Sequence, residues 1–173
     1  NYAKTKGKVE MTADTEPAFW EAQSQLLRLS NTAMVVTTDL NDNQEDLHPT
    51  YKWEIGRRLS LVALAKDYNK KIDYSGPIYK NVKFKDGKGI LTFENFKNSN
   101  DSQEAIKGFE LADEDGRFEP ASAKIVVKTL EVSSTAVNHP TAIRYNWSEN
   151  PAGNFYQNRL PALPFRLSSP RPP

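Results

Sequence analysis

The spacing of hydrophobic and polar positions changes near residue 72 and divides the chain into two parts. In the first part, apolar side chains recur three or four residues apart from Pro17 onward, which predicts a helix that ends near residues 30–31. The apolar run at 33–38 (AMVVTT) predicts a buried strand, and helical spacing returns over about residues 50–68. A short, continuously apolar strand between two helices favours an α/β fold, in which helices cover both faces of a parallel sheet.

Beyond a linker at 72–78 (IDYSGPI), apolar residues alternate with polar ones, which is typical of strands with one buried face. Val82 and Phe84 alternate before an Asp86-Gly87 turn, and the alternation resumes after it, which predicts a β-hairpin. Further strands are expected near 109–111, 124–127, 130–132 and 142–145. Turn signals recur roughly every eight to twelve residues, so we predict a mainly antiparallel, sandwich-like region.

The composition of the chain argues against several kinds of partner and site. The chain has 173 residues, 38% of them hydrophobic, which allows one ordinary domain or two small ones. A formal net charge of +1 gives no strong field toward nucleic acid or an anionic membrane. The absence of cysteine excludes disulfides and thiolate metal sites. The first residues hold neither an initiator Met nor the apolar core of a signal peptide, so we expect a processed or excised chain.

One loop carries most of the candidate chemistry. The segment Asp39–Arg58 follows the predicted strand and contains His48, one of two histidines in the chain. Open α/β folds place their sites in loops at the carboxyl ends of strands. A carboxylate two or three residues before a histidine, here Asp46 or Glu45, can hold the imidazole in one tautomer and stabilise its protonated form. This arrangement would supply the general base of a nucleophilic hydrolase and the acid that orients it. No serine of the chain, however, lies in a Gly-x-Ser turn that would supply the nucleophile.

Several longer motifs occur in a defined order. They are MVVTTDL (34–40), DLHP (46–49), GRRLSLVALA (56–65), YSGPIYKNVKF (74–84), DGRFEPASAKI (115–125) and RYNWSENPAGNFYQNRLPALPFR (144–166). In this order they resemble the C-terminal part of sialate O-acetylesterases and related carbohydrate acetylesterases of the SGNH hydrolase superfamily. The resemblance extends over about residues 17–167.

The resemblance implies a domain division and a fold. Residues 1–71 would be the C-terminal part of an SGNH hydrolase catalytic domain, formed by the last helix, strand and helix of a flavodoxin-like, three-layer α/β fold. Residues 72–173 would be a β-rich accessory region with an extended, Pro-rich tail. The nucleophilic serine would lie on an upstream segment of the same enzyme that this chain lacks, so the chain alone is expected to be inactive.

The resemblance also implies a mechanism. The serine would attack an acetyl ester on a sugar, and His48 would take the serine proton and return it to the leaving hydroxyl. Relatives favour Asp46 as the acid that orients His48, with Glu45 as the alternative and Asp42 as a more distant one. The substrate would be an acetylated sialic acid or polysaccharide, with no cofactor, metal, nucleic acid or membrane involved. The enzyme would be secreted or periplasmic, or lysosomal in a eukaryote.

A competing interpretation is a non-catalytic β-sandwich accessory or carbohydrate-binding module. Four aromatic residues, Tyr145, Trp147, Phe155 and Tyr156, suit a sugar-stacking surface, although aromatic residues of a closing strand more often belong to a core. His139 lies in a turn between strands and has no partner pattern. Under both interpretations, residues 1–70 should expose a large apolar surface unless another segment covers it.

Overall fold

The computed structural model describes residues 12–40, 48, 50–97, 99–101 and 104–169. The helical elements are α1 (Thr15–Ser24), the short 3-10 helix η1 (Gln25–Arg28) and α2 (Lys52–Lys66). The strands are β1 (Ile78–Lys85), β2 (Lys88–Glu94), β3 (Ile106–Ala112), β4 (Glu119–Val126), β5 (Thr129–Ser133), β6 (Ala142–Tyr145), β7 (Tyr156–Gln157), β8 (Leu160–Pro161) and β9 (Phe165–Ser168). None of the described helices is both long and apolar enough to cross a membrane.

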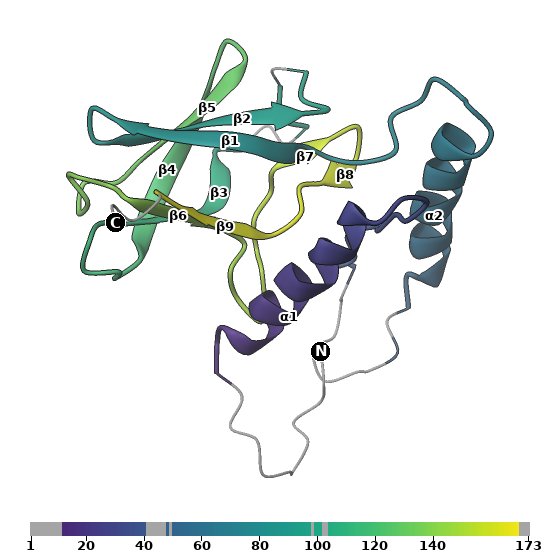
Figure 1. The fold of residues 1–173 in the computed structure, drawn as a ribbon, viewed down its shortest axis with the longest axis horizontal. Coiled ribbons are helices and arrows are strands. Elements are labelled where there is room, and N and C mark those ends of the chain that lie inside the picture. The colour runs from purple at the N-terminus through teal and green to yellow at the C-terminus, as the bar shows by residue number, and fades with distance from the viewer. Residues whose placement is uncertain (1–11, 41–47, 49, 98, 102–103, 170–173) are drawn as a thin grey trace.

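Seven strands form one antiparallel sheet in the order β1-β2-β5-β4-β3-β6-β9, while β7 and β8 pair separately. The sheet curls so that its two edge strands, β1 and β9, approach each other (Figure 1). The rings of Tyr79 on β1 and Phe165 on β9 lie 4.9 Å apart between centroids, although no backbone pairing joins the two strands. The region is therefore a nearly closed barrel and not the two-layer sandwich that turn spacing suggested.

The predicted hairpin is confirmed. β1 and β2 pair with Val82 opposite Leu91, and the connecting residues Asp86 and Gly87 both have positive φ, 50° and 72°. Two consecutive residues at positive φ are the requirement of the tight hairpin turn that matches the twist of the strands. Local sequence therefore determines this part of the sheet.

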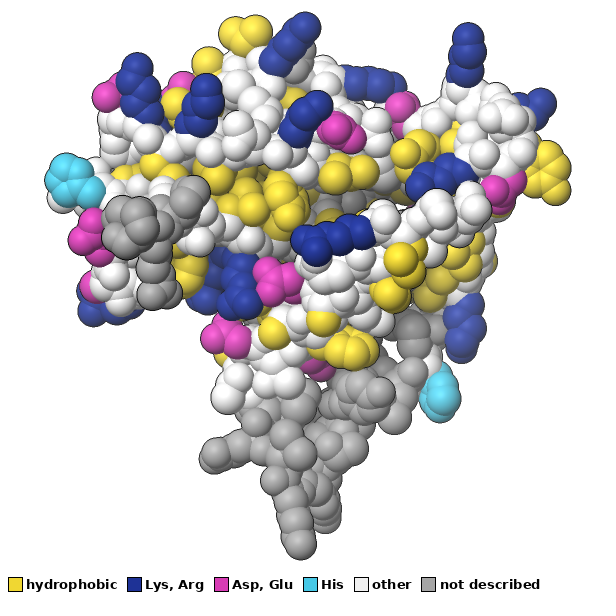
Figure 2. All heavy atoms as spheres, viewed as in Figure 1, with side chains coloured by type: hydrophobic (Ala, Val, Ile, Leu, Met, Phe, Trp, Pro, Cys, Tyr) yellow, Lys and Arg dark blue, Asp and Glu magenta, His cyan; other side chains and the backbone are white. Residues whose placement is uncertain are grey.

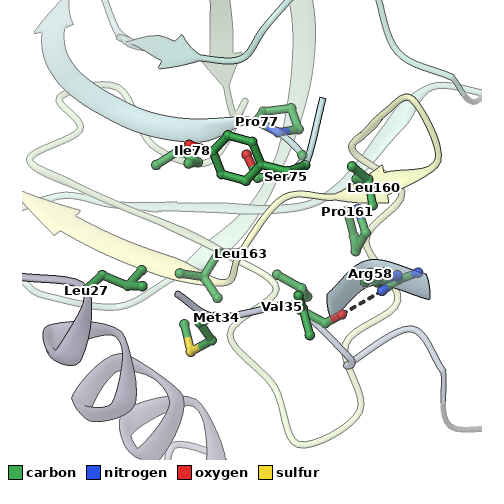
Figure 3. A pocket seen from close by; sticks show the side chains of 13 residues that line it. Leu27, Met34, Val35, Arg58, Ser75, Pro77, Ile78, Leu160, Pro161 and Leu163 are labelled. Atoms are coloured by element: carbon green, nitrogen blue, oxygen red, sulfur yellow. Dashed lines mark hydrogen bonds between the residues drawn. The ribbon is translucent and has the colours of Figure 1, made fainter. Parts of the chain in front are cut away.

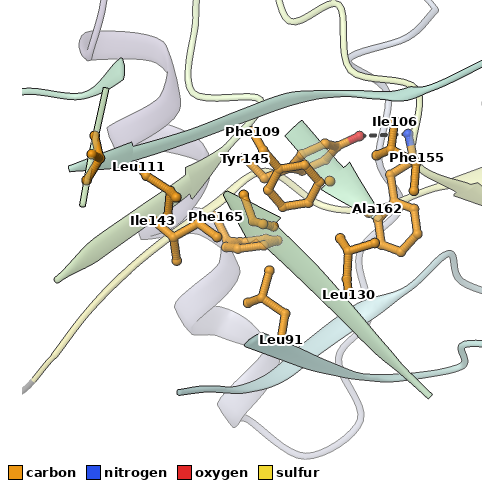
Figure 4. Close-up of a cluster of buried hydrophobic side chains, with 13 residues drawn as sticks. Leu91, Ile106, Phe109, Leu111, Leu130, Ile143, Tyr145, Phe155, Ala162 and Phe165 are labelled. Carbon is orange, nitrogen blue, oxygen red and sulfur yellow. Dashed lines mark hydrogen bonds between the residues drawn. The ribbon is translucent and has the colours of Figure 1, made fainter. Parts of the chain in front are cut away.

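The barrel interior holds the hydrophobic core (Figure 4). Its most buried members are fully or almost fully enclosed: Leu91, Phe109, Leu111, Leu130, Val132, Ile143, Tyr145, Phe155, Ala162 and Phe165. The backbone N–H of Phe155 donates to the buried Tyr145 hydroxyl at 3.0 Å, so this polar atom is satisfied inside the core. Tyr145 and Phe155 meet edge to face at 6.3 Å, a favoured aromatic geometry.

The helical part lies against one side of the barrel (Figure 1). Polar contacts hold α1 there: the Trp147 indole N–H donates to Asp14 at 2.8 Å, and Arg166 donates to Glu21 at 2.9 Å. The two predicted helices are present, at 15–28 and 52–66.

The predicted α/β fold is wrong for the described chain, which is mainly β. Residues 33–38 form no strand, and every strand pair of the described residues is antiparallel. The physical reason is that a strand needs a neighbour to satisfy its backbone groups, and the described residues offer none beside 33–38. A single apolar segment between two helices therefore does not build the three-layer arrangement.

Candidate functional site

The predicted catalytic residues lie only partly within the described structure. His48 is exposed and lies four residues before the start of α2 at Lys52. The three candidate acids, Asp46, Glu45 and Asp42, fall outside the described residues. Which carboxylate orients His48 therefore stays a prediction.

The best-defined polar arrangement near His48 is centred on Arg58 of α2. Its side chain is only 4% exposed. The guanidinium donates two parallel hydrogen bonds to the Asp39 carboxylate, both 2.7 Å long, and a third to the Val36 carbonyl at 2.6 Å. Its Nε donates to Glu54 one turn earlier at 2.8 Å. Arg58 thus uses its planar fork in the bidentate geometry that favours arginine over lysine.

Charge within this cluster is balanced by short contacts. Glu54 also accepts hydrogen bonds from Arg57 at 2.6 and 2.7 Å, and together the Arg57 and Arg58 contacts lower the pKa of Glu54 to about 2 against the opposing effect of burial. Burial disfavours the charge of Arg58, yet its hydrogen bonds to Asp39 and Glu54 raise its pKa overall. Burial, with the nearby Asp39 carboxylate, raises the pKa of Tyr156 to about 12. Glu54, Arg58 and Tyr156 therefore each keep one charge state across the physiological range.

This cluster joins the residue that precedes the His48 loop to the helix that follows it. Asp39 lies just before the loop and Arg58 lies within the helix that follows it, so their contact joins positions 19 residues apart. The Tyr156 hydroxyl lies 3.3 Å from Asp39 and connects the same point to the barrel. The arrangement can position a loop, but it offers no group that is free to react.

The sequence pattern identified the segment Asp39–Arg58 but not this arrangement. Arg57 and Arg58 both form ion pairs with Glu54 on the helix face. The contact of Asp39 with Arg58 was not predicted. The available signal was Glu54 and Arg58, four residues apart on the helix side that also carries the buried Val62.

An apolar cavity of about 70 Å³ lies beside Arg58, between residues 34–36 and the segments 74–78 and 160–163 (Figure 3). Leu27 and Met34 line it on the helical side, and Pro161 and Leu163 line it on the barrel side. A cavity of this size and lining suits packing between the two parts, not a sugar.

The remaining candidates are structural. Tyr145, Trp147 and Phe155 are at most 5% exposed, which places three of the four proposed sugar-stacking residues in the interior. His139 is exposed in the turn before β6. Among the described residues, no group of three or more His, Asp or Glu side chains could hold a metal ion.

Fold and candidate site together define an antiparallel barrel preceded by two helices, with a polar cluster that joins residues 36–39 to α2. This architecture is similar to part of a carbohydrate acetylesterase. The solved structure is XAC1771 of Xanthomonas citri, described as a novel carbohydrate acetylesterase, which matches 94% of this chain with a TM-score of 0.84 and 35% sequence identity. The chain spans 38% of the length of XAC1771. No protein-family model and no curated protein matches the chain.

Proposed function

We propose that this chain is one portion of a larger carbohydrate acetylesterase and is not catalytic by itself. The observation that carries the proposal is the similarity of almost the whole chain to less than half of XAC1771. In this proposal, residues 72–173 form a non-catalytic accessory barrel. Residues 1–71 belong to the catalytic region, which another segment completes.

The structure of the barrel supports an accessory role over a sugar-binding one. Tyr145, Trp147 and Phe155 are enclosed, whereas sugar recognition by stacking needs an exposed ring face. The exposed Lys80 and Lys83 lie on the edge strand β1, where charged side chains discourage unwanted strand pairing. The barrel thus has the features of a stable scaffold.

A finer candidate function concerns His48. It would act as the general base toward a serine on a segment outside this chain, oriented by Asp46 or Glu45, and would deacetylate a sialic acid or a polysaccharide. The exposure of His48 and the contact that joins the residue before its loop to the helix after it favour this role over a structural one. A general base must reach its substrate, and it gains from a defined position.

The test compares the chain alone with the chain co-expressed with the part of XAC1771 that it does not span. We expect p-nitrophenyl acetate turnover only in the co-expressed sample, and loss of more than 100-fold in His48→Ala. His139→Ala is the matched control, because it removes the other histidine, exposed on the barrel, and should leave turnover unchanged. Equal turnover in His48→Ala and His139→Ala would remove His48 from the mechanism, and turnover by the chain alone would contradict the accessory assignment.

A further inference from the structure

Large apolar side chains are exposed mainly in the helical part of the chain. Those within residues 19–72 are Phe19, Leu26, Leu27, Leu29, Tyr51, Trp53, Leu59, Leu64, Tyr68 and Ile72, with exposed fractions from 38% to 69%. On the barrel strands and their turns, only Ile78, Tyr79, Val126 and Val127 among the described residues belong to this class. In the space-filling view, apolar side chains are exposed over the helical part and also over the barrel (Figure 2). The predicted apolar surface of the first third of the chain is therefore present.

Helix α2 leaves part of its apolar stripe exposed. Its buried positions are Glu54, Arg58 and Val62, two of which are charged. Leu59 belongs to the apolar stripe that predicted the helix, yet it is 53% exposed, and Trp53 is 67% exposed. A helix normally turns its apolar stripe toward a core. The described chain provides no core on the side of Leu59 and Trp53.

The segment at 33–38 makes few backbone hydrogen bonds within the described residues. It is half-buried or exposed, and it belongs to no strand ladder of the structure. Among the described residues, two of its carbonyls accept hydrogen bonds: that of Val36 from Arg58, and that of Thr37 from Leu40. Apolar side chains of β propensity, together with unpaired N–H and C=O groups, favour the addition of a neighbouring strand.

We infer that α1, η1, residues 33–38 and α2 form one continuous docking surface for the remainder of a longer esterase chain. This inference rests on the proposed function, because XAC1771 extends well beyond the part that this chain matches and so contains a companion region of sufficient size. The companion covers the Leu59 and Trp53 side of α2 and pairs its backbone with residues 33–38. A patch of this composition exceeds what a soluble chain usually leaves open to water.

The polar cluster gives the surface a defined shape before the companion binds. Arg58 holds Val36 and Asp39 on one side and Glu54 on the other, so residues 33–38 and α2 keep a fixed relation. A preorganised surface loses less conformational entropy on association than one that must order first. The cluster therefore positions the docking surface as well as the His48 loop.

The test uses this chain co-expressed with the part of XAC1771 that it does not span. Leu59→Glu and Trp53→Glu should each lower co-purification more than tenfold, because each places a charge at the centre of an apolar contact. Val127→Glu is the matched control, since Val127 is 78% exposed on the β4–β5 turn of the barrel. All three positions are exposed, so the melting temperature of the isolated chain should change little.

In the complex, hydrogen exchange of the amides at 33–38 should slow at least tenfold.

The outcomes separate this inference from the proposed function. Absence of a complex, or a complex that is insensitive to Leu59→Glu, would overturn the docking surface. An isolated chain that dimerises and is made monomeric by Leu59→Glu would assign the surface to a second copy and overturn it equally. A complex that depends on Leu59 but has no esterase turnover would keep the docking surface and reject the esterase function.

Discussion

Replacing Arg58 by alanine should selectively open the helical part of the molecule. Arg58 is almost fully buried and donates to three residues: Asp39 and the Val36 carbonyl in one segment, and Glu54 in its own helix. Removing it leaves the carbonyl of Val36 without its donor and the carboxylate of Asp39 with only the Tyr156 hydroxyl at 3.3 Å. It also removes the contact that holds α2 to residues 36–39.

The expected cost follows from the surroundings of each partner. Breaking a buried ion pair by removing one partner costs about 3–5 kcal/mol. In the Arg58→Ala variant, Glu54 keeps its ion pair with Arg57, and the Asp39 carboxylate, 18% exposed, can regain contact with water. The loss of stability should therefore lie at the lower end of this range, about 3 kcal/mol. Arg58→Lys keeps the charge but loses the fork, and it should cost about 2 kcal/mol.

Hydrogen exchange is the suitable assay, because α2 can open without unfolding of the barrel. A loss of about 3 kcal/mol corresponds to exchange roughly 100-fold faster at the amides of α2. Arg57→Ala is the matched control. Among the described residues the Arg57 side chain, 37% exposed, pairs with Glu54 alone, so exchange should rise by a factor of about five or less. Equal effects of Arg57→Ala and Arg58→Ala would refute the reasoning.

Three further predictions concern the pH dependence of α2, two glycines and the barrel core. The folded pKa of Glu54 is about 2 and its ordinary value is 4.5, so the stability that its carboxylate contributes is complete above pH 4.5 and is lost as the pH falls toward 2. Circular dichroism of α2 should follow this loss, and Glu54→Gln should abolish this pH dependence. Gly56 lies inside α2 with open space around it, so Gly56→Ala should stabilise the helix by about 1 kcal/mol in thermal unfolding. At Gly76, by contrast, a Cβ would overlap the carbonyl oxygens of Pro161 and Leu160, so Gly76→Ala should destabilise the chain or prevent folding. Leu130→Ala should cost about 2–5 kcal/mol in urea unfolding because Leu130 is fully buried in the barrel, and a cost below 1 kcal/mol would contradict the core described above.

Much of the site could not be predicted from the sequence, for reasons that differ between residues. His48 was singled out by its position after an apolar run and among acids, which is a local pattern. The contact between Asp39 and Arg58 depends on how a loop returns the chain to α2, and no local rule connects two residues 19 positions apart. The aromatic residues Tyr145 and Phe155 suited either a core or a sugar surface, and only the closed barrel placed them inside.

The sequence by itself determined the elements whose signals are local. Alternating residues around Asp86-Gly87 defined the first hairpin, because two positive φ angles and a two-residue period leave little choice. Helical spacing located α1 and α2 within a few residues.

Tertiary structure alone decided the strand order, the near closure between β1 and β9, and the state of residues 33–38. These features rest on pairings between distant segments. A strand forms only where a neighbouring backbone completes its hydrogen bonds.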